Sequence, residues 1–105
     1  MKSITPAVLK TKLDAGENLR LLDVREAWEY DLCNIEGSMN ISMSNIDQIQ
    51  NEMNMDDEII VICHHGMRSF QVANYLETKD YRNISNLEGG VDAWARTIDT
   101  DMAQY

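Results

Sequence analysis

The stretch Ile59–Ser69 reads I-I-V-I-C-H-H-G-M-R-S, and it gives the strongest indication of fold in this 105-residue chain. The run from Ile59 to Cys63 is too short to cross a membrane and lacks the polar alternation of a half-exposed strand. Such a run is typical of a central strand that is covered on both faces of a parallel sheet. The residues that follow place either Phe70, Ala73 and Leu76 or Val72, Tyr75 and Leu76 on one helical face. The stretch therefore predicts a buried strand, a tight loop that opens with the cysteine, and a helix.

The rest of the chain alternates between predicted helices and strands. Thr5 is a typical N-cap, and we expect Ser44 to cap a second helix. Further helices are expected at residues 26–32, 68–78 and 90–97, and strands at residues 19–24, 39–42, 59–62 and 83–86. This alternation predicts an α/β fold, with a parallel sheet of about five strands and helices on both faces. A chain of 105 residues with 44% hydrophobic content can bury one core, so we expect a single domain over residues 1–105.

The predicted loop gathers groups that stabilise a negatively charged sulfur. In open α/β sheets, ligands bind at the carboxyl ends of strands, where a helix N-terminus presents its amides. His64, His65 and Arg68 supply three potential cations close to the cysteine. Gly66 allows a positive φ, so successive N–H groups can curl around one anion. Because the thiolate is the nucleophilic form of cysteine, we interpret Cys63 as a nucleophile and not as an inert buried thiol.

Four blocks of this sequence resemble the rhodanese-like (thiosulfate sulfurtransferase) family. The loop Cys63–Ser69 matches the C-x-x-G-x-R-S/T pattern of that family, in which the cysteine carries a persulfide. The other blocks are Leu21–Tyr30, Ile35–Ile41 and Leu87–Trp94, and all four follow the order found in the family. They cover roughly residues 20 to 95, so the resemblance extends over the whole domain.

The resemblance implies a rhodanese-like fold and a sulfurtransferase activity. Cys63 would take sulfane sulfur from thiosulfate or a persulfide donor and pass it to a thiol, cyanide or a protein acceptor. The substrate would lie against the remaining residues of the loop, which are His64, His65, Gly66, Met67, Arg68 and Ser69. Arg68 either faces the substrate or fixes the loop through a carboxylate, and the sequence leaves both alternatives open. No cofactor is implied.

The chain departs from the family pattern in two places. Cys33-Asn34 and Glu36 stand where the family has Gly-His and a proline, which makes this turn less rigid. His64 stands where the family often has an arginine. Because histidine titrates near pH ~6.5, the loop is expected to be less positive at neutral pH. The first departure also removes any contribution from the histidine of the family, and the second bears on the rate with small anionic sulfur donors but does not affect the cysteine.

Two other functions remain as alternatives. Cysteine-dependent phosphatases and arsenate reductases place five residues between cysteine and arginine, whereas four separate Cys63 from Arg68. The smaller ring of amides suits one sulfur atom better than a tetrahedral phosphate. A binding or regulatory module of the same fold, without turnover, is the second alternative. Such modules usually lack the cysteine that is present here.

The charge of the chain indicates its classes of partner. The net charge is −9, and residues 14–58 hold twelve acidic residues against two arginines. This balance opposes binding to nucleic acid or to anionic membranes, and it repels free thiosulfate at long range. We therefore hypothesise that the working donor is a protein persulfide or a low-molecular-weight persulfide. The chain shows no signal peptide or membrane-length run, so we expect a cytoplasmic protein, either a monomer or a homodimer.

A few further residues have a functional and a structural interpretation. Asp23 and Arg25 end a strand at the same edge as Cys63 and could support the site, but a structural ion pair is favoured there. Cys33 is either a resolving thiol for a Cys63 persulfide or a small apolar side chain in a turn. A metal site is not expected, because the adjacent residues 63–65 would strain a tetrahedral site and no second cluster completes it.

Overall fold

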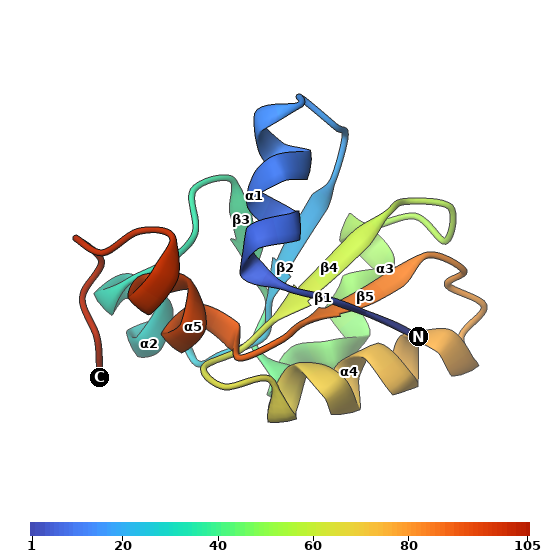
Figure 1. Ribbon diagram of the computed structural model, residues 1–105. Coiled ribbons are helices and arrows are strands. Elements are labelled where there is room, and N and C mark those ends of the chain that lie inside the picture. Colours follow the sequence, from blue (N-terminus) through green and yellow to red (C-terminus); the bar gives the residue numbers. More distant parts are fainter.

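A computed structural model describes all residues from 1 to 105. Five strands form one parallel sheet in the order β1-β5-β4-β2-β3, as Figure 1 shows. The strands are β1 (Lys2–Ile4), β2 (Arg20–Asp23), β3 (Ser38–Asn40), β4 (Ile59–Ile62) and β5 (Ile84–Leu87). The strand predicted from the apolar run is thus the central one, and the predicted α/β class is confirmed.

Helices cover both faces of this sheet. They are α1 (Pro6–Asp14), α2 (Ala27–Leu32), η1 (Met43–Gln48, a 3-10 helix), α3 (Ile49–Glu52), α4 (Met67–Thr78) and α5 (Gly90–Thr97). Side chains of α1 and α5 pack in one core with Ile60 and Ile62 of β4. Side chains of α3 and α4 pack in the other core with Ile59 and Val61. Because successive side chains of a strand point to opposite faces, β4 contributes to both cores and is fully buried.

The structure differs from the predicted elements in two places. The edge strand β1 was not predicted, since its three residues carry only one buried side chain, Ile4. The helix expected after Ser44 is also wrong in detail. Its cap is Ser42, whose hydroxyl accepts a hydrogen bond from the Ser44 amide, and it begins as a 3-10 helix with a non-helical residue at Asn45. Because Ser42 already caps this 3-10 helix, strand β3 ends at Asn40, before the expected residue 42.

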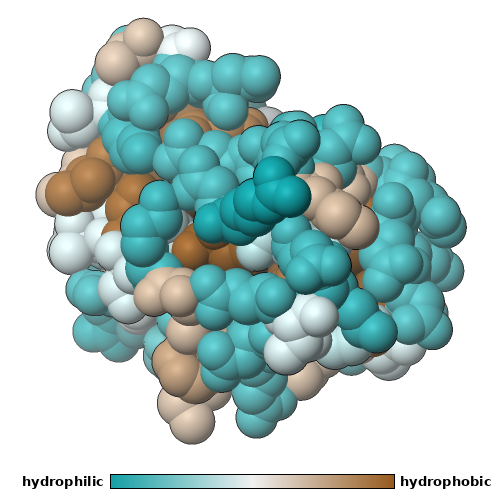
Figure 2. All heavy atoms as spheres, turned by 90° about the vertical axis from the view of Figure 1, so that its right-hand side faces the viewer, coloured by the Kyte–Doolittle hydropathy of each residue, from teal (hydrophilic) through white to brown (hydrophobic).

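The parallel arrangement brings the carboxyl ends of all five strands to one end of the molecule. Side chains and loops that follow β2, β4 and β5 therefore meet there, as is usual for binding sites in open α/β sheets. The opposite end, which faces the viewer in Figure 2, is mostly hydrophilic. None of the helices is long and apolar enough to cross a membrane.

Candidate active site

Cys63 follows the last residue of β4 and lies just ahead of α4. Its side chain is only 1% exposed, and its Sγ accepts a hydrogen bond from the Gly66 amide at 3.0 Å. Gly66 adopts a φ of +103°, a backbone conformation that favours glycine and turns this amide back toward the sulfur. Of the loop amides that were expected to surround the sulfur, that of Gly66 alone reaches it. The next amides, in the first turn of α4, have no carbonyl partner within the helix and point toward the same end.

Ser69 provides the second hydrogen-bond donor to the sulfur. It is fully buried in the first turn of α4, and its hydroxyl lies 3.3 Å from the Cys63 Sγ. The same hydroxyl also bonds to Oδ1 of Asn86 on β5, and the Asn86 amide nitrogen donates to the Gly66 carbonyl at 3.2 Å. Because a hydroxyl has one proton for these two acceptors, Ser69 can shift it toward the sulfur when negative charge develops there. Asn86 thus connects the middle of the loop, at Gly66, and the first turn of α4, at Ser69, to strand β5.

The start of α5 fixes the loop from its other side. The amide of Val91 donates to the Cys63 carbonyl at 2.9 Å, and the amide of Asp92 donates to the His64 carbonyl at 3.0 Å. Gly90 allows this close approach, because a Cβ at this position would lie 2.2 Å from the Cys63 carbonyl oxygen. The start of α5 therefore holds the backbone of Cys63 and His64 through two hydrogen bonds.

Arg68 points away from the sulfur and fixes the loop to α2. Its guanidinium forms two hydrogen bonds with the carboxylate of Glu29, at 2.6 and 2.9 Å. Glu29 is almost fully buried, and the bonds from Arg68 lower its pKa to about 2. The same bonds raise the pKa of Arg68, which therefore stays charged. Of the two alternatives left open for Arg68, this geometry is that of an anchor through a carboxylate.

Asp23 and Arg25 form a fully buried ion pair at the end of β2. The Arg25 guanidinium bonds both oxygens of Asp23, at 2.8 to 3.1 Å, and also the backbone carbonyls of Glu29 and Cys33. Burial is the largest single effect on the pKa of Arg25 and lowers it, but the hydrogen bonds and charges of Asp23 and Tyr105 together outweigh burial and raise this pKa. Neither side chain offers a free charge to a substrate. Cys33 lies in the core on the face of the sheet opposite to that of Cys63.

The two histidines of the loop lie close together, with their ring planes tilted by 33°. Their ring centroids are 3.9 Å apart, and the ring of Tyr105 lies parallel to His64 at the same centroid distance. Burial is the main cause that lowers the pKa of His64, followed by the neighbouring charge of His65. The ligand atoms of His64, His65 and Asp92 lie within 4.8 Å of one another, close enough to hold a metal ion. The carboxylate of Asp92 is already bonded to Arg96, at 2.9 Å.

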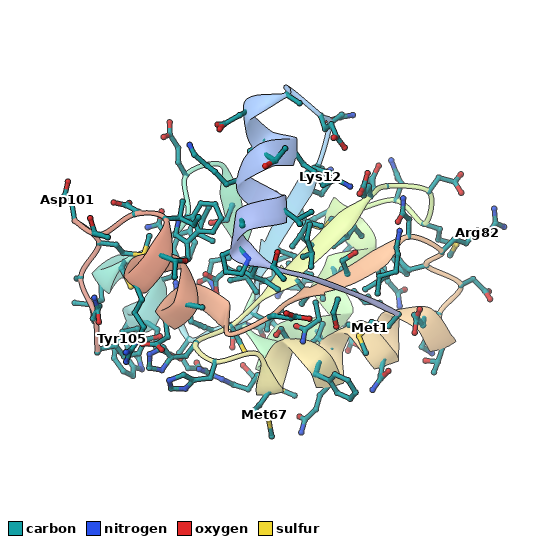
Figure 3. The ribbon with its side chains drawn as sticks, viewed as in Figure 1. Met1, Lys12, Met67, Arg82, Asp101 and Tyr105 are labelled. Carbon is teal, nitrogen blue, oxygen red and sulfur yellow. The ribbon has the colours of Figure 1, made fainter.

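Met67 lies at the rim of the loop, where it is 75% exposed and projects away from the body of the protein (Figure 3). Phe70, one turn further along α4, is half exposed, and Trp28 on α2 is 64% exposed. Large apolar side chains are therefore found on the helices next to the loop, in contrast to the hydrophilic end in Figure 2. Of the substrate residues predicted from sequence, Gly66 and Ser69 contact the sulfur. Arg68 anchors the loop to α2, and Met67 lies at the rim of the loop.

Comparison with known proteins identifies the family. The family described as "Rhodanese-like domain" matches residues 5–97, which include every element from α1 to α5. The chain belongs to the rhodanese-like family. Sulfurtransferases are among its relatives. YtwF of Bacillus subtilis, which bears the name of a sulfurtransferase, is 38% identical over 94 residues, covering 90% of each chain. The thiosulfate sulfurtransferase GlpE of Pseudoalteromonas translucida is 33% identical over 78 residues, or 74% of each chain.

Other relatives carry this domain within a longer protein. YrkF of B. subtilis is 35% identical over 91 residues, and these make up 87% of the present chain but 49% of YrkF. Among solved structures, a rhodanese-like domain protein from Staphylococcus aureus is similar with a TM-score of 0.84 and 35% identity. The match covers 90% of the present chain and 91% of that protein. The rhodanese-like fold is therefore established by sequence and by structure.

The contacts of four residues of this rhodanese-like site were not predicted from the sequence. Glu29 and Gly90 lie within two of the family blocks, so their positions carried a signal but their contacts did not. Asn86 precedes the last block, and nothing in its surroundings in the sequence points to a loop 20 residues earlier. Tyr105 lies in a polar segment outside all four blocks, and no pattern in the sequence placed it against His64.

Proposed function

We propose that this protein is a sulfurtransferase that carries sulfane sulfur as a persulfide on Cys63, and that residues 1–105 act as one domain. The observation that carries this proposal is the position of the Cys63 Sγ. It lies between the Gly66 amide at 3.0 Å and the Ser69 hydroxyl at 3.3 Å, at the start of a twelve-residue helix. Two hydrogen-bond donors and a helix N-terminus are groups that can stabilise negative charge as it develops on a sulfur during transfer.

In the first half of the cycle, the Cys63 thiolate attacks the outer sulfur of the donor. A new S–S bond forms, the bond between the two sulfurs of the donor breaks, and the leaving group takes the electron pair as sulfite or as a thiolate. In the second half, a thiol, cyanide or a protein acceptor attacks the outer sulfur of the persulfide. The Cys63 thiolate is then the leaving group, so no external oxidant or reductant is needed.

The outer sulfur of the persulfide lies one bond beyond Sγ, toward the first turn of α4. The amides of Met67, Arg68 and Ser69 have no carbonyl partner within the helix and are free to donate to this atom. Fixed donors of this kind stabilise developing charge without reorganisation, because Asn86, Glu29 and the start of α5 already hold the loop in place.

The charges around the loop support a persulfide as the working donor, ahead of free thiosulfate. Arg68 is bonded twice to Glu29, and Arg25 is buried against Asp23, so neither guanidinium is free to bind a small dianion. A kcat/KM with thiosulfate above roughly 10⁴ M⁻¹s⁻¹, within the usual range for an enzyme and its substrate, would contradict this donor preference.

The test is mass spectrometry after incubation with thiosulfate and, separately, with glutathione persulfide. We expect a gain of about 32 Da on the peptide that contains Cys63, and loss of this sulfur when cyanide is added. The variant Cys63→Ser should lose both the mass gain and sulfur transfer. The matched variant Cys33→Ser should keep both, because Cys33 lies on the opposite face of the sheet.

Each alternative predicts a different outcome of this experiment. A binding or regulatory module would leave Cys63 unmodified by either donor. A phosphatase would hydrolyse a chromogenic phosphate ester in a Cys63-dependent reaction and would not take up sulfur. Sulfur transfer that persists in Cys63→Ser would refute the assignment of the nucleophile, and loss of transfer in Cys33→Ser would instead make Cys33 a resolving thiol.

A further inference from the structure

Tyr105 lies against the active loop, although it is far from the loop in sequence. The segment after α5 runs back past α2, and Tyr105 lies at the same end of the molecule as the loop (Figures 1 and 3). Its ring is almost parallel to that of His64, with an interplanar angle of 5° and centroids 3.9 Å apart. The ring of His65 also lies close to His64, with centroids 3.9 Å apart and the two planes tilted by 33°. The edge of Tyr105 further contacts Trp28, with ring centroids 5.9 Å apart.

The hydroxyl of Tyr105 joins the two arginines of the site. It donates to Oε2 of Glu29 at 2.7 Å and accepts from the Arg25 guanidinium at 2.9 Å. The same Glu29 oxygen accepts from Arg68. Burial is the main cause that raises the pKa of Tyr105 to about 12, so the phenol stays protonated and can both donate and accept. A single side chain thus touches His64 and Arg25 and reaches Arg68 through Glu29.

The charge of His64 depends on how well its ring is covered. Burial and the charges of His65 and Arg25 lower its pKa, while Asp92 and Glu29 raise it, and the lowering outweighs the raising. Tyr105 covers one face of this ring, so its side chain contributes to the burial. His64 is therefore a neutral side chain at neutral pH. Without the tyrosine ring, the imidazole would meet water and its pKa would rise toward the ordinary value of 6.5.

We propose that Tyr105 is a specificity-determining residue, which selects sulfur donors of low charge and disfavours small dianions such as thiosulfate. It does so by covering His64 and by engaging Arg25 and Glu29, so that His64, Arg25 and Arg68 offer less positive charge to a donor that approaches the buried Cys63. This inference rests on the proposed role of Cys63 as the sulfur carrier. It adds the residue that sets which donors reach the sulfur.

The test compares a neutral and an anionic alkylating reagent of similar size, iodoacetamide and iodoacetate. Both react with the same thiolate, so its ionised fraction cancels from the ratio of their rate constants, and peptide mapping follows Cys63 alone. At pH 5.5 we expect Tyr105→Ala to raise the iodoacetate-to-iodoacetamide ratio roughly three- to tenfold over that of the unmodified protein, the effect of one added positive charge near the sulfur. The difference between the two proteins should shrink as the pH rises from 5.5 to 7.5, because the uncovered imidazole of His64 loses its proton over this range.

The variant Tyr105→Phe is the matched control, because it keeps the ring over His64 and removes only the hydroxyl. We expect its ratio and its pH profile to stay near those of the unmodified protein. In sulfur-transfer assays at the same pH, Tyr105→Ala should lower the KM for thiosulfate by a similar factor. Circular dichroism and a thermal melt establish that each variant is folded.

The outcomes separate this inference from the proposed function. If a folded Tyr105→Ala variant has the same iodoacetate-to-iodoacetamide ratio as the unmodified protein at every pH from 5.5 to 7.5, Tyr105 does not determine charge selectivity. This conclusion holds whatever the sulfur-transfer assays give. If Tyr105→Ala changes both rate constants by the same factor, its role is structural and the inference fails. If the ratio shifts as expected but Cys63 never gains sulfur, the charge selectivity stands and the sulfurtransferase assignment fails.

Discussion

Replacing Glu29 with glutamine tests the anchor on which the active loop depends. Glutamine keeps the shape of the side chain but removes its charge, and so ends the paired hydrogen bonds with Arg68. It also places an NH2 group, which donates, where the carboxylate accepts from both Arg68 and Tyr105. Because Glu29 is almost fully buried, water cannot replace the lost acceptor.

The magnitude follows from the pKa of Glu29, which the bonds from Arg68 lower from an ordinary 4.5 to about 2. At about 1.4 kcal/mol for each pH unit, this shift corresponds to about 3 kcal/mol of stability at neutral pH. The folded pKa is the lower one, so this contribution is present above pH 4.5 and is lost as the pH falls toward 2. By pH 3, about 2 kcal/mol should be gone.

Urea unfolding at pH 7, 5, 4 and 3 measures this contribution. We expect Glu29→Gln to be about 2–3 kcal/mol less stable at pH 7, and the difference from the unmodified protein to shrink by about 2 kcal/mol by pH 3. Glu36→Gln is the control, since Glu36 is exposed and forms no ion pair or side-chain hydrogen bond. A difference for Glu29→Gln that is the same at pH 7 and pH 3 would refute the reasoning, because it would exclude the carboxylate as the origin of the effect.

Two other substitutions test how the loop is held. Gly90→Ala places a Cβ 2.2 Å from the Cys63 carbonyl oxygen, whereas Gly37→Ala meets nothing within 4 Å at a similarly positive φ. Urea unfolding should therefore give Gly90→Ala a loss of more than about 3 kcal/mol and Gly37→Ala about 1 kcal/mol, and equal losses would contradict the close approach. Ser69→Ala removes one donor to the sulfur, so alkylation of Cys63 at pH 7 should slow roughly threefold to tenfold; an unchanged rate would exclude this hydrogen bond from activating the thiolate.

Short-range patterns were sufficient to predict the central elements of the fold. The apolar run of β4 and the helical spacing after Gly66 predicted a strand, a loop and a helix within one residue of their observed bounds. The pattern failed where side chains carry little information. β1 pairs with β5 through its backbone, and two of its three side chains are exposed, so no apolar alternation marks it. The 3-10 helix η1 depends on a local cap at Ser42 that a neighbouring serine at position 44 obscures.

For the candidate site too, the sequence predicted what lies close together in the chain and missed contacts between distant residues. The sequence identified Cys63, Gly66 and Ser69, because residues within one loop and one helical turn are close in any fold that contains them. It left the direction of Arg68 open, since that depends on a carboxylate 39 residues earlier in the chain. The contact of Tyr105 with Glu29 spans 76 residues and could not be inferred from local spacing.

These long-range contacts separate the reaction from the choice of substrate. Cys63 and the hydrogen-bond donors to its sulfur lie within the loop and the first turn of α4. The charge near the loop depends instead on Glu29 on α2 and on Tyr105, which together engage both arginines and cover His64. Under the proposed function, two relatives with identical loops can therefore prefer donors of different charge, according to what covers the histidine. The loop motif then indicates the sulfur carrier, and the residues around it indicate the donor.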